Sequence, residues 1–117
     1  MAEHIMKLHS QPFAKIKDGS KTIELRLYDE KRQRISVGDT IRFVSAESAA
    51  DEAVVLVRNL FIFDSFDELY KHLPLTECGY TEEDVHTASP SDMEMYYSVE
   101  KQRQYGVVGI QIALLQQ

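Results

Sequence analysis

The clearest strand pattern in this 117-residue chain is Lys21-Thr22-Ile23-Glu24-Leu25-Arg26-Leu27-Tyr28. Successive side chains of a strand point to opposite faces, so the aliphatic residues Ile23, Leu25 and Leu27 share one face. That face predicts a strand packed on the core. The other face carries Glu24 and Arg26. Because the strand rises about 7 Å over two residues, their side chains can reach each other or one ligand. The alternative interpretation of this pair is a solvated strand face of mixed charge.

Four further segments have strand patterns, and three have helix signals. The expected strands cover residues 4–9, 40–44, 54–63 and 105–114, and the expected helices cover residues 10–19, 66–72 and 90–104. Turns or short helices join most of these strands. We therefore predict one α+β domain over residues 1–117, a small, mainly antiparallel β-barrel with about three short helices that plug its ends. A parallel, doubly wound sheet is the alternative.

The junction between the first expected helix and the strand at 21–28 is rich in lysine. Lys15 and Lys17 lie in the last helical turn, where positive charge complements the helix dipole. Lys21 then has the parity of the aliphatic strand residues, so we expect it at the end of the barrel interior. There it either reaches the rim or lines the mouth of a cavity.

The third expected helix carries a stripe of side chains at core-facing spacing. Met93, Tyr96, Tyr97 and Glu100 follow the order i, i+3, i+4, i+7. A carboxylate that continues an apolar stripe needs a cationic partner or water, so Glu100 is a candidate acid, base or anchor for a basic group. The alternative is a glutamate at the edge of the stripe that reaches solvent.

The charge of the chain is unevenly distributed. Its formal net charge is −6, yet residues 7–42 hold nine bases against five acids and residues 43–117 hold four against thirteen. The acidic total argues against a protein that coats nucleic acid non-specifically. The local excess of bases near Tyr28 is compatible with a site for phosphate and a stacked base, or with an ordinary lysine-rich surface.

Other classes of protein are disfavoured by what the sequence lacks. No apolar run approaches the ~20 residues of a membrane-spanning helix, and the first residues do not form an apolar signal stretch. The single cysteine, Cys78, fits a reducing, cytoplasmic location. The four histidines show no metal-ligand spacing, so we expect neither a metal nor another cofactor.

Several motifs, taken in order along nearly the whole chain, resemble the ASCH domain. They are Phe13-x-x-Ile16-x-x-Gly19-x-Lys21-Thr22-Ile23-Glu24-Leu25-Arg26, Val37-Gly38-Asp39-x-Ile41-x-Phe43, Ser65-Phe66-x-x-Leu69, Tyr97-x-x-Glu100 and Tyr105-Gly106-Val107-Val108-Gly109-Ile110. The resemblance implies the PUA-like superfamily, whose fold is a small β-barrel with accompanying helices. It also implies binding of RNA or modified nucleosides in a cleft beside the motif that contains Lys21.

Some bacterial members of the family hydrolyse the acetyl amide of N4-acetylcytidine with a lysine, a threonine and a glutamate. Lys21 matches that lysine, Glu24 stands at the threonine position, and Glu77 is a loose counterpart of the glutamate. The resemblance therefore implies an RNA or nucleoside partner, with an N4-acetylcytidine amidohydrolase and a protein-interaction adaptor, acting through the acidic segment 77–94, as alternatives.

The cleft of this hypothesis contains three candidate catalytic residues, Lys21, Glu24 and Glu100. The candidate ligand-binding residues are Arg26, Tyr28, Tyr97, Lys15 and Lys17. We expect a monomer or weak dimer.

Overall fold

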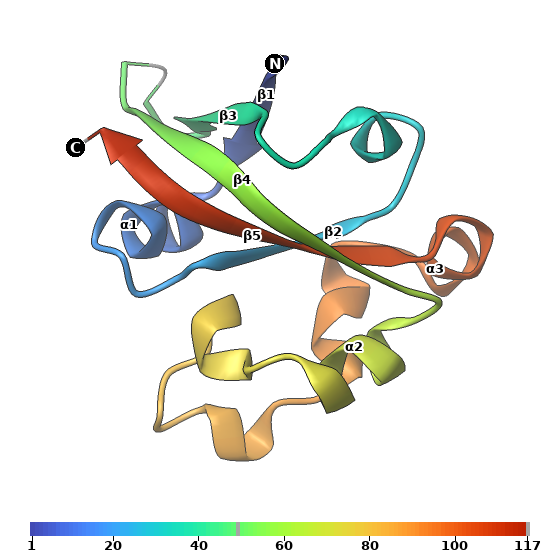
Figure 1. The fold of residues 1–117 in the computed structure, drawn as a ribbon. Coiled ribbons are helices and arrows are strands. Elements are labelled where there is room, and N and C mark those ends of the chain that lie inside the picture. Colours follow the sequence, from blue (N-terminus) through green and yellow to red (C-terminus); the bar gives the residue numbers. More distant parts are fainter. Residues whose placement is uncertain (49, 117) are drawn as a thin grey trace.

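The computed structural model describes residues 1–48 and 50–116. One five-stranded sheet runs through the molecule in the order β1-β3-β4-β5-β2 (Figure 1). Its strands are β1 (Glu3–Leu8), β2 (Ile23–Leu27), β3 (Thr40–Ser45), β4 (Glu52–Phe63) and β5 (Val107–Gln116). β1 pairs with β3 in parallel, and the other three pairings are antiparallel. The prediction of a mainly antiparallel barrel is confirmed, in the form of a curled half-barrel.

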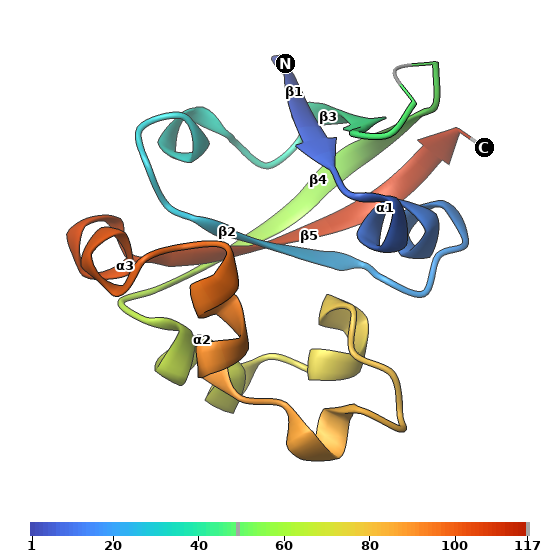
Figure 2. The same cartoon turned by 180° about the vertical axis from the view of Figure 1, so that it is seen from behind.

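The helices are short. They are α1 (Ser10–Lys17), α2 (Phe66–His72) and α3 (Val99–Tyr105), and four 3-10 turns accompany them, η1 (Arg32–Arg34), η2 (Leu75–Cys78), η3 (Val85–Thr87) and η4 (Pro90–Met95). α1 follows β1 on one side of the sheet, while the segment from α2 to η4 passes across the molecule below β2 in the view of Figure 1 (Figures 1 and 2). No helix in the described residues is long and apolar enough to cross a membrane.

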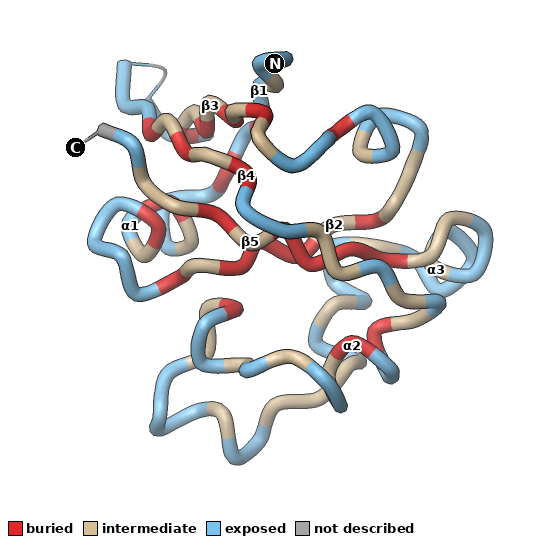
Figure 3. Tube along the Cα trace, viewed as in Figure 1, coloured by how far each residue is buried: buried red, intermediate tan, exposed pale blue. Residues whose placement is uncertain are grey.

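Two hydrophobic clusters hold these layers together (Figure 3). The first lies inside the curl of the sheet, where Phe43 and Ile110 are fully buried and α1 contributes Phe13 and Ile16. The second lies on the other face of the sheet, between β2 and α2, and includes Phe66 and Leu69 of that helix.

The aliphatic residues of β2 belong to the second cluster, which corrects one expectation. Ile23, Leu25 and Leu27 pack against α2, not inside the barrel. Their polar neighbours Glu24 and Arg26 are paired in register with Ile110 and Val108 of β5, whose side chains belong to the first cluster. Opposite residues of an antiparallel pair share a face. The polar pair therefore lies on the inner face of the sheet, because α2 supplies a second apolar layer on the outside.

The inner face is open along one line, between β1 and β2. These two strands are the edges of the sheet. The Arg26 guanidinium crosses this seam and donates a 3.0 Å hydrogen bond to the backbone carbonyl of Lys7 in β1. A side chain, rather than a ladder of backbone bonds, therefore links the two edges here.

The expected helix over 90–104 is wrong in its extent. η4 begins after Ser89 and ends at Met95, and α3 starts afresh at Val99. Ser98 causes this restart, because its extended backbone and its hydroxyl, which accepts from the backbone N–H of Lys101, form a new N-cap. Glu100 therefore does not share a helix face with Tyr96 and Tyr97, because no single helix contains all three residues.

Candidate functional site

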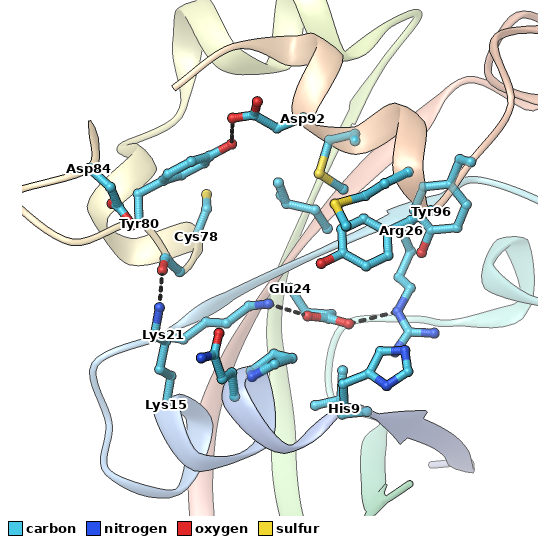
Figure 4. A pocket seen from close by; sticks show the side chains of 18 of the residues that line it. His9, Lys15, Lys21, Glu24, Arg26, Cys78, Tyr80, Asp84, Asp92 and Tyr96 are labelled. Atoms are coloured by element: carbon cyan, nitrogen blue, oxygen red, sulfur yellow. Dashed lines mark hydrogen bonds and ion pairs between the residues drawn. The ribbon is translucent and has the colours of Figure 1, made fainter. Parts of the chain in front are cut away.

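A cavity of about 460 Å³ opens between the seam of the sheet and the segment 70–97 (Figure 4). Its floor is formed by β2 and by Lys21 just before that strand, one wall by the end of β1 and by α1, and the opposite wall by η2, η4 and their flanking residues. Its volume lies within the ~300–1,000 Å³ typical of pockets for small organic ligands.

The floor of the cavity carries a buried trio of charges. Lys21 Nζ lies 2.7 Å from Glu24 Oε1, and Arg26 Nε donates to Glu24 Oε2 at 2.6 Å. The side chains of Lys21, Glu24 and Arg26 are only 10%, 3% and 13% exposed. One carboxylate between two cations leaves the trio with a single positive charge beside the cavity.

The pKa of Glu24 depends on two opposing effects. Burial alone would raise the pKa of its carboxyl, but the adjacent charges of Lys21 and Arg26 hold it below its ordinary value. Burial also acts to lower the pKa of Arg26, yet the Glu24 carboxylate raises it overall. Glu24 is consequently a stable anion and a weak base, which suits it to hold two cations in place.

The turn after η2 fixes the Lys21 end of the cavity. Gly79 has a φ of +115°, a conformation that glycine adopts at low cost, and the stem of Lys21 passes beside it. The backbone carbonyl of Gly79 accepts a 2.6 Å hydrogen bond from Lys15 Nζ. Next to this turn, the Thr22 hydroxyl donates to the Glu77 carboxylate at 2.8 Å. These bonds join α1 and the start of β2 to η2 across that end of the cavity.

The wall opposite the cations is aromatic. Tyr97 stacks on Phe66, with ring centroids 6.2 Å apart and planes at 19°. Further along, the hydroxyls of Tyr70 and Tyr80 are 2.7 Å apart, and Tyr80 also donates to Asp92 Oδ2 at 2.7 Å. Burial raises the pKa of Tyr97 and of Tyr80. These phenols are therefore neutral hydrogen-bonding groups at ordinary pH.

The charges around the cavity are segregated. Four cations line the side formed by β1, α1 and β2: Lys7, Lys15, Lys21 and Arg26. Asp84 and Asp92 line the other side, where both are engaged internally, Asp84 by the backbone N–H of Thr81 and Asp92 by Tyr80. A ligand in the cavity therefore meets cations on one side and aromatic rings on the other.

The structure brings together five of the residues that sequence reasoning selected: Lys15, Lys21, Glu24, Arg26 and Tyr97 all line the cavity. It places three elsewhere. Tyr28 packs against the cluster inside the sheet, and Lys17 lies over the Phe13 ring with Nζ 5.9 Å from its centroid. Glu100 is exposed in the first turn of α3, outside the cavity. The exposed Glu77 also lies outside, beside Thr22.

Sequence reasoning missed several lining residues. Tyr80 and Asp92 were not candidates, because Tyr80 follows a short turn and Asp92 lies in η4, and only tertiary contacts bring both to the cavity. Lys7 was considered only among the bases of residues 7–42 that are compatible with a phosphate site, and His9 was not a candidate; both stand at the end of an edge strand. Their position beside Arg26 becomes visible only once β1 and β2 are known to flank one seam.

A metal site and a cysteine nucleophile are not supported by the described residues. No group of three or more His, Cys, Asp or Glu side chains there is arranged to hold a metal ion. Cys78 lines the cavity but is buried, and burial raises the pKa of its thiol to about 12. A thiol in this state is a poor nucleophile.

Comparisons with known proteins agree with the fold. A family model described as the ASCH domain matches residues 6–116. The crystal structure of the hypothetical protein PH0355 is similar over 97% of this chain and 99% of its own, with 30% identity and a TM-score of 0.79. The solution structure of PF0455 from Pyrococcus furiosus is similar over 98% and 99%, with 32% identity and a TM-score of 0.70.

A variant of ZmASCH from Zymomonas mobilis matches 95% of this chain and 67% of its own, at 14% identity and a TM-score of 0.63. At that identity the likeness concerns the fold alone. No curated protein matches the chain.

Proposed function

The chain belongs to the ASCH domain family, and we propose that its cleft binds one nucleotide or modified nucleoside of RNA. The observation that carries this proposal is the buried Lys21–Glu24–Arg26 trio on the floor of a cavity whose opposite wall is aromatic. Single-stranded RNA is bound in this way in general, by cations that contact phosphate or base edges and by aromatic side chains that stack on bases.

Each side chain of the trio has a role in this proposal. Lys21 and Arg26 donate hydrogen bonds to a base carbonyl or a phosphate. Glu24 holds both cations in position, because each of its oxygens contacts one of them. Tyr97, fixed against Phe66, offers an apolar surface to the base. Lys15 adds positive charge at the Lys21 end of the cavity, where its ammonium also donates to the Gly79 carbonyl.

Binding is better supported than amide hydrolysis. The residue at the position of the family's catalytic threonine is Glu24, whose carboxylate is held by two cations and whose pKa is lowered, so it accepts a proton poorly. Glu77, the loose counterpart of the third catalytic residue, hydrogen-bonds Thr22 outside the cavity. We therefore expect the purified protein to release no cytidine from N4-acetylcytidine, measured by chromatography over hours at high protein concentration.

Binding is also better supported than the adaptor hypothesis. That hypothesis used the acidic segment 77–94, but two carboxylates of this segment are occupied inside the molecule: Asp84 accepts from the Thr81 backbone and Asp92 from Tyr80. These two carboxylates already accept hydrogen bonds from donors of this chain, which leaves fewer of their acceptor positions for a basic partner protein.

The direct test is a titration of the ¹⁵N-labelled protein with the four ribonucleoside 5′-monophosphates, followed by NMR. We expect shifts at the cavity residues for at least one of them and weaker binding as salt rises, since phosphate contacts release counterions. The decisive variant combines Lys21→Met, Glu24→Leu and Arg26→Met, which removes the trio without leaving a buried charge unpaired.

A matched control is Lys31→Met with Arg34→Met, which removes one lysine and one arginine that are exposed and lie outside the cavity. The trio variant should lose binding while the control retains it. Equal binding by the wild type and a folded trio variant would refute the proposed site.

A further inference from the structure

Two neighbouring apolar side chains at the rim of the cavity are exposed without any evident role in folding. Met95 and Tyr96 are 78% and 56% exposed, and both line the cavity. Tyr97, the next residue, is half-buried against Phe66. The ring of Tyr96 lies 6.3 Å from that of Tyr97, with the planes tilted by 52°. Tyr96 therefore extends the aromatic wall from Tyr97 to the rim of the cavity and keeps much of its surface in water.

The cavity is bridged at one end and unbridged at the other. At the Lys21 end, Lys15 of α1 donates to the Gly79 carbonyl and links the two walls. At the other end, Arg26 lies between His9 on one side and Tyr96 on the other (Figure 4). Among the described residues, no hydrogen bond connects β1 or α1 with the segment 90–98. A chain that enters the cavity can therefore continue outwards past Tyr96.

The charge beside this open end is positive. Arg26 donates a hydrogen bond to the backbone carbonyl of Lys7, which places Lys7 at the Arg26 end of the cavity. Tyr96 lines the same end, and the side chain of Lys7 is exposed there. An ammonium group and an exposed aromatic ring that line the same cavity match the alternation of phosphate and base along a single nucleic-acid strand. An apolar peptide would offer no complement to that charge.

We propose that Tyr96 stacks the nucleotide next to the one held in the cavity, with Lys7 at the phosphate that joins them. The ligand is then a single-stranded RNA segment of at least two nucleotides, not a free nucleoside. This inference rests on the proposed function, since the first nucleotide must occupy the cavity. Stacking on one aromatic side chain is worth about 5- to 150-fold in affinity per base.

The experiment compares mononucleotides with dinucleotides on the same protein. The probes are the four ribonucleoside 5′-monophosphates and the four homodinucleotides that carry a 5′-phosphate, titrated by NMR against wild type, Tyr96→Ala, Tyr96→Phe and Ile62→Ala. Ile62 is the matched control, because its side chain is 52% exposed on β4 and lies outside the cavity. Both Tyr96 variants are expected to fold, since the side chain is mostly in solvent.

The wild type should bind at least one dinucleotide about 5-fold or more tightly than its mononucleotide. In Tyr96→Ala the dinucleotide should bind no more than about 2-fold more tightly than the mononucleotide, while Tyr96→Phe and Ile62→Ala keep the gain. A dinucleotide that binds no better than the mononucleotide overturns this inference and leaves the proposed function standing. Absence of binding by every probe overturns both. Self-association that Tyr96→Ala abolishes would assign the ring to a second copy of the chain and also overturn it.

Discussion

Replacing Glu24 by Gln should destabilise the protein strongly, because it removes the negative charge that two buried cations share. Glu24 is 3% exposed, and its oxygens lie 2.7 Å from Lys21 Nζ and 2.6 Å from Arg26 Nε. Because all three side chains are deeply buried, hydration of the two cations can compensate only in part for the loss of the carboxylate charge. Breaking a buried ion pair by removing one partner costs about 3–5 kcal/mol. For a chain of this length, that corresponds to a fall in Tm of roughly 12–20 °C.

The assay is urea unfolding followed by far-UV circular dichroism at pH 7, with thermal melts in parallel. The control is Glu77→Gln, which changes an exposed carboxylate that hydrogen-bonds Thr22, and its cost should be about 0.5 kcal/mol or less. The variant that combines Lys21→Met, Glu24→Leu and Arg26→Met should have a free energy of unfolding close to that of the wild type, or higher. The reason is that well-packed apolar side chains can replace a buried ionic group.

The effect of Glu24→Gln also has a defined pH dependence. The pKa of Glu24 is lowered in the folded protein, so the stabilisation by its charge is fully present above the unfolded pKa, about 4.3, and is lost as the pH falls through the lower folded value. The gap between wild type and variant should therefore be constant from pH 6 to 8 and narrow below about pH 4.3. A cost under about 1 kcal/mol at pH 7 would refute the reasoning, since the carboxylate would then be neither buried nor needed by its partners.

Three further changes test other parts of the structure. Asp39→Asn should lower stability at neutral pH. Hydrogen bonds from His4 and two backbone N–H groups hold the pKa of Asp39 at about 2, so the difference in stability from wild type should shrink as the pH falls from about 4 towards 2. Equal pH profiles of wild type and variant in urea melts would contradict this. Gly109→Ala should cost about 1 kcal/mol, since the new methyl group would lie 2.7 Å from Leu73 Cδ1, the end of a side chain that can shift, and 3.2 Å from Ile23 Cγ2. Leu73→Ala in the same chain should recover part of the loss, and additive costs in urea melts would speak against the clash. Cys78 should react with a disulfide reagent far more slowly in the folded protein than in urea, because burial raises its pKa to about 12; equal rates by absorbance would show that the thiol is accessible.

Much of the fold follows from local patterns that the residues themselves carry. The alternation at 21–28 marks β2, and the capping pattern of Ser65 with Glu68 marks α2, where the Ser65 hydroxyl does accept from the Glu68 backbone N–H. These signals depend on neighbours within a few residues, so sequence alone is enough to detect them. The stripe from Met93 to Glu100 misled for the same reason, because a serine N-cap can end one helix and begin another without disturbing the apolar spacing.

The candidate site divides in the same way. Its chemical groups, Lys21, Glu24 and Arg26, are close in sequence on one short segment, and their proximity could be predicted from the rise of a strand. Their burial could not, because it depends on α2, which takes the aliphatic face of β2 and leaves the polar face towards the inside of the sheet. The opposite wall comes from residues 70–97, which contact β2 only after the chain has folded.

The sequence by itself determined the family of this protein, its strands, and the three charged groups at one strand. Only the tertiary structure decided that these groups form a buried trio, that an aromatic wall faces them, and that Glu100 takes no part. The physical reason is the range of the interactions involved. Strand alternation and helix caps act over a few residues, whereas burial and pKa shifts arise from segments that are distant in the chain, as Lys21 and Asp92, 71 residues apart, are on one cavity.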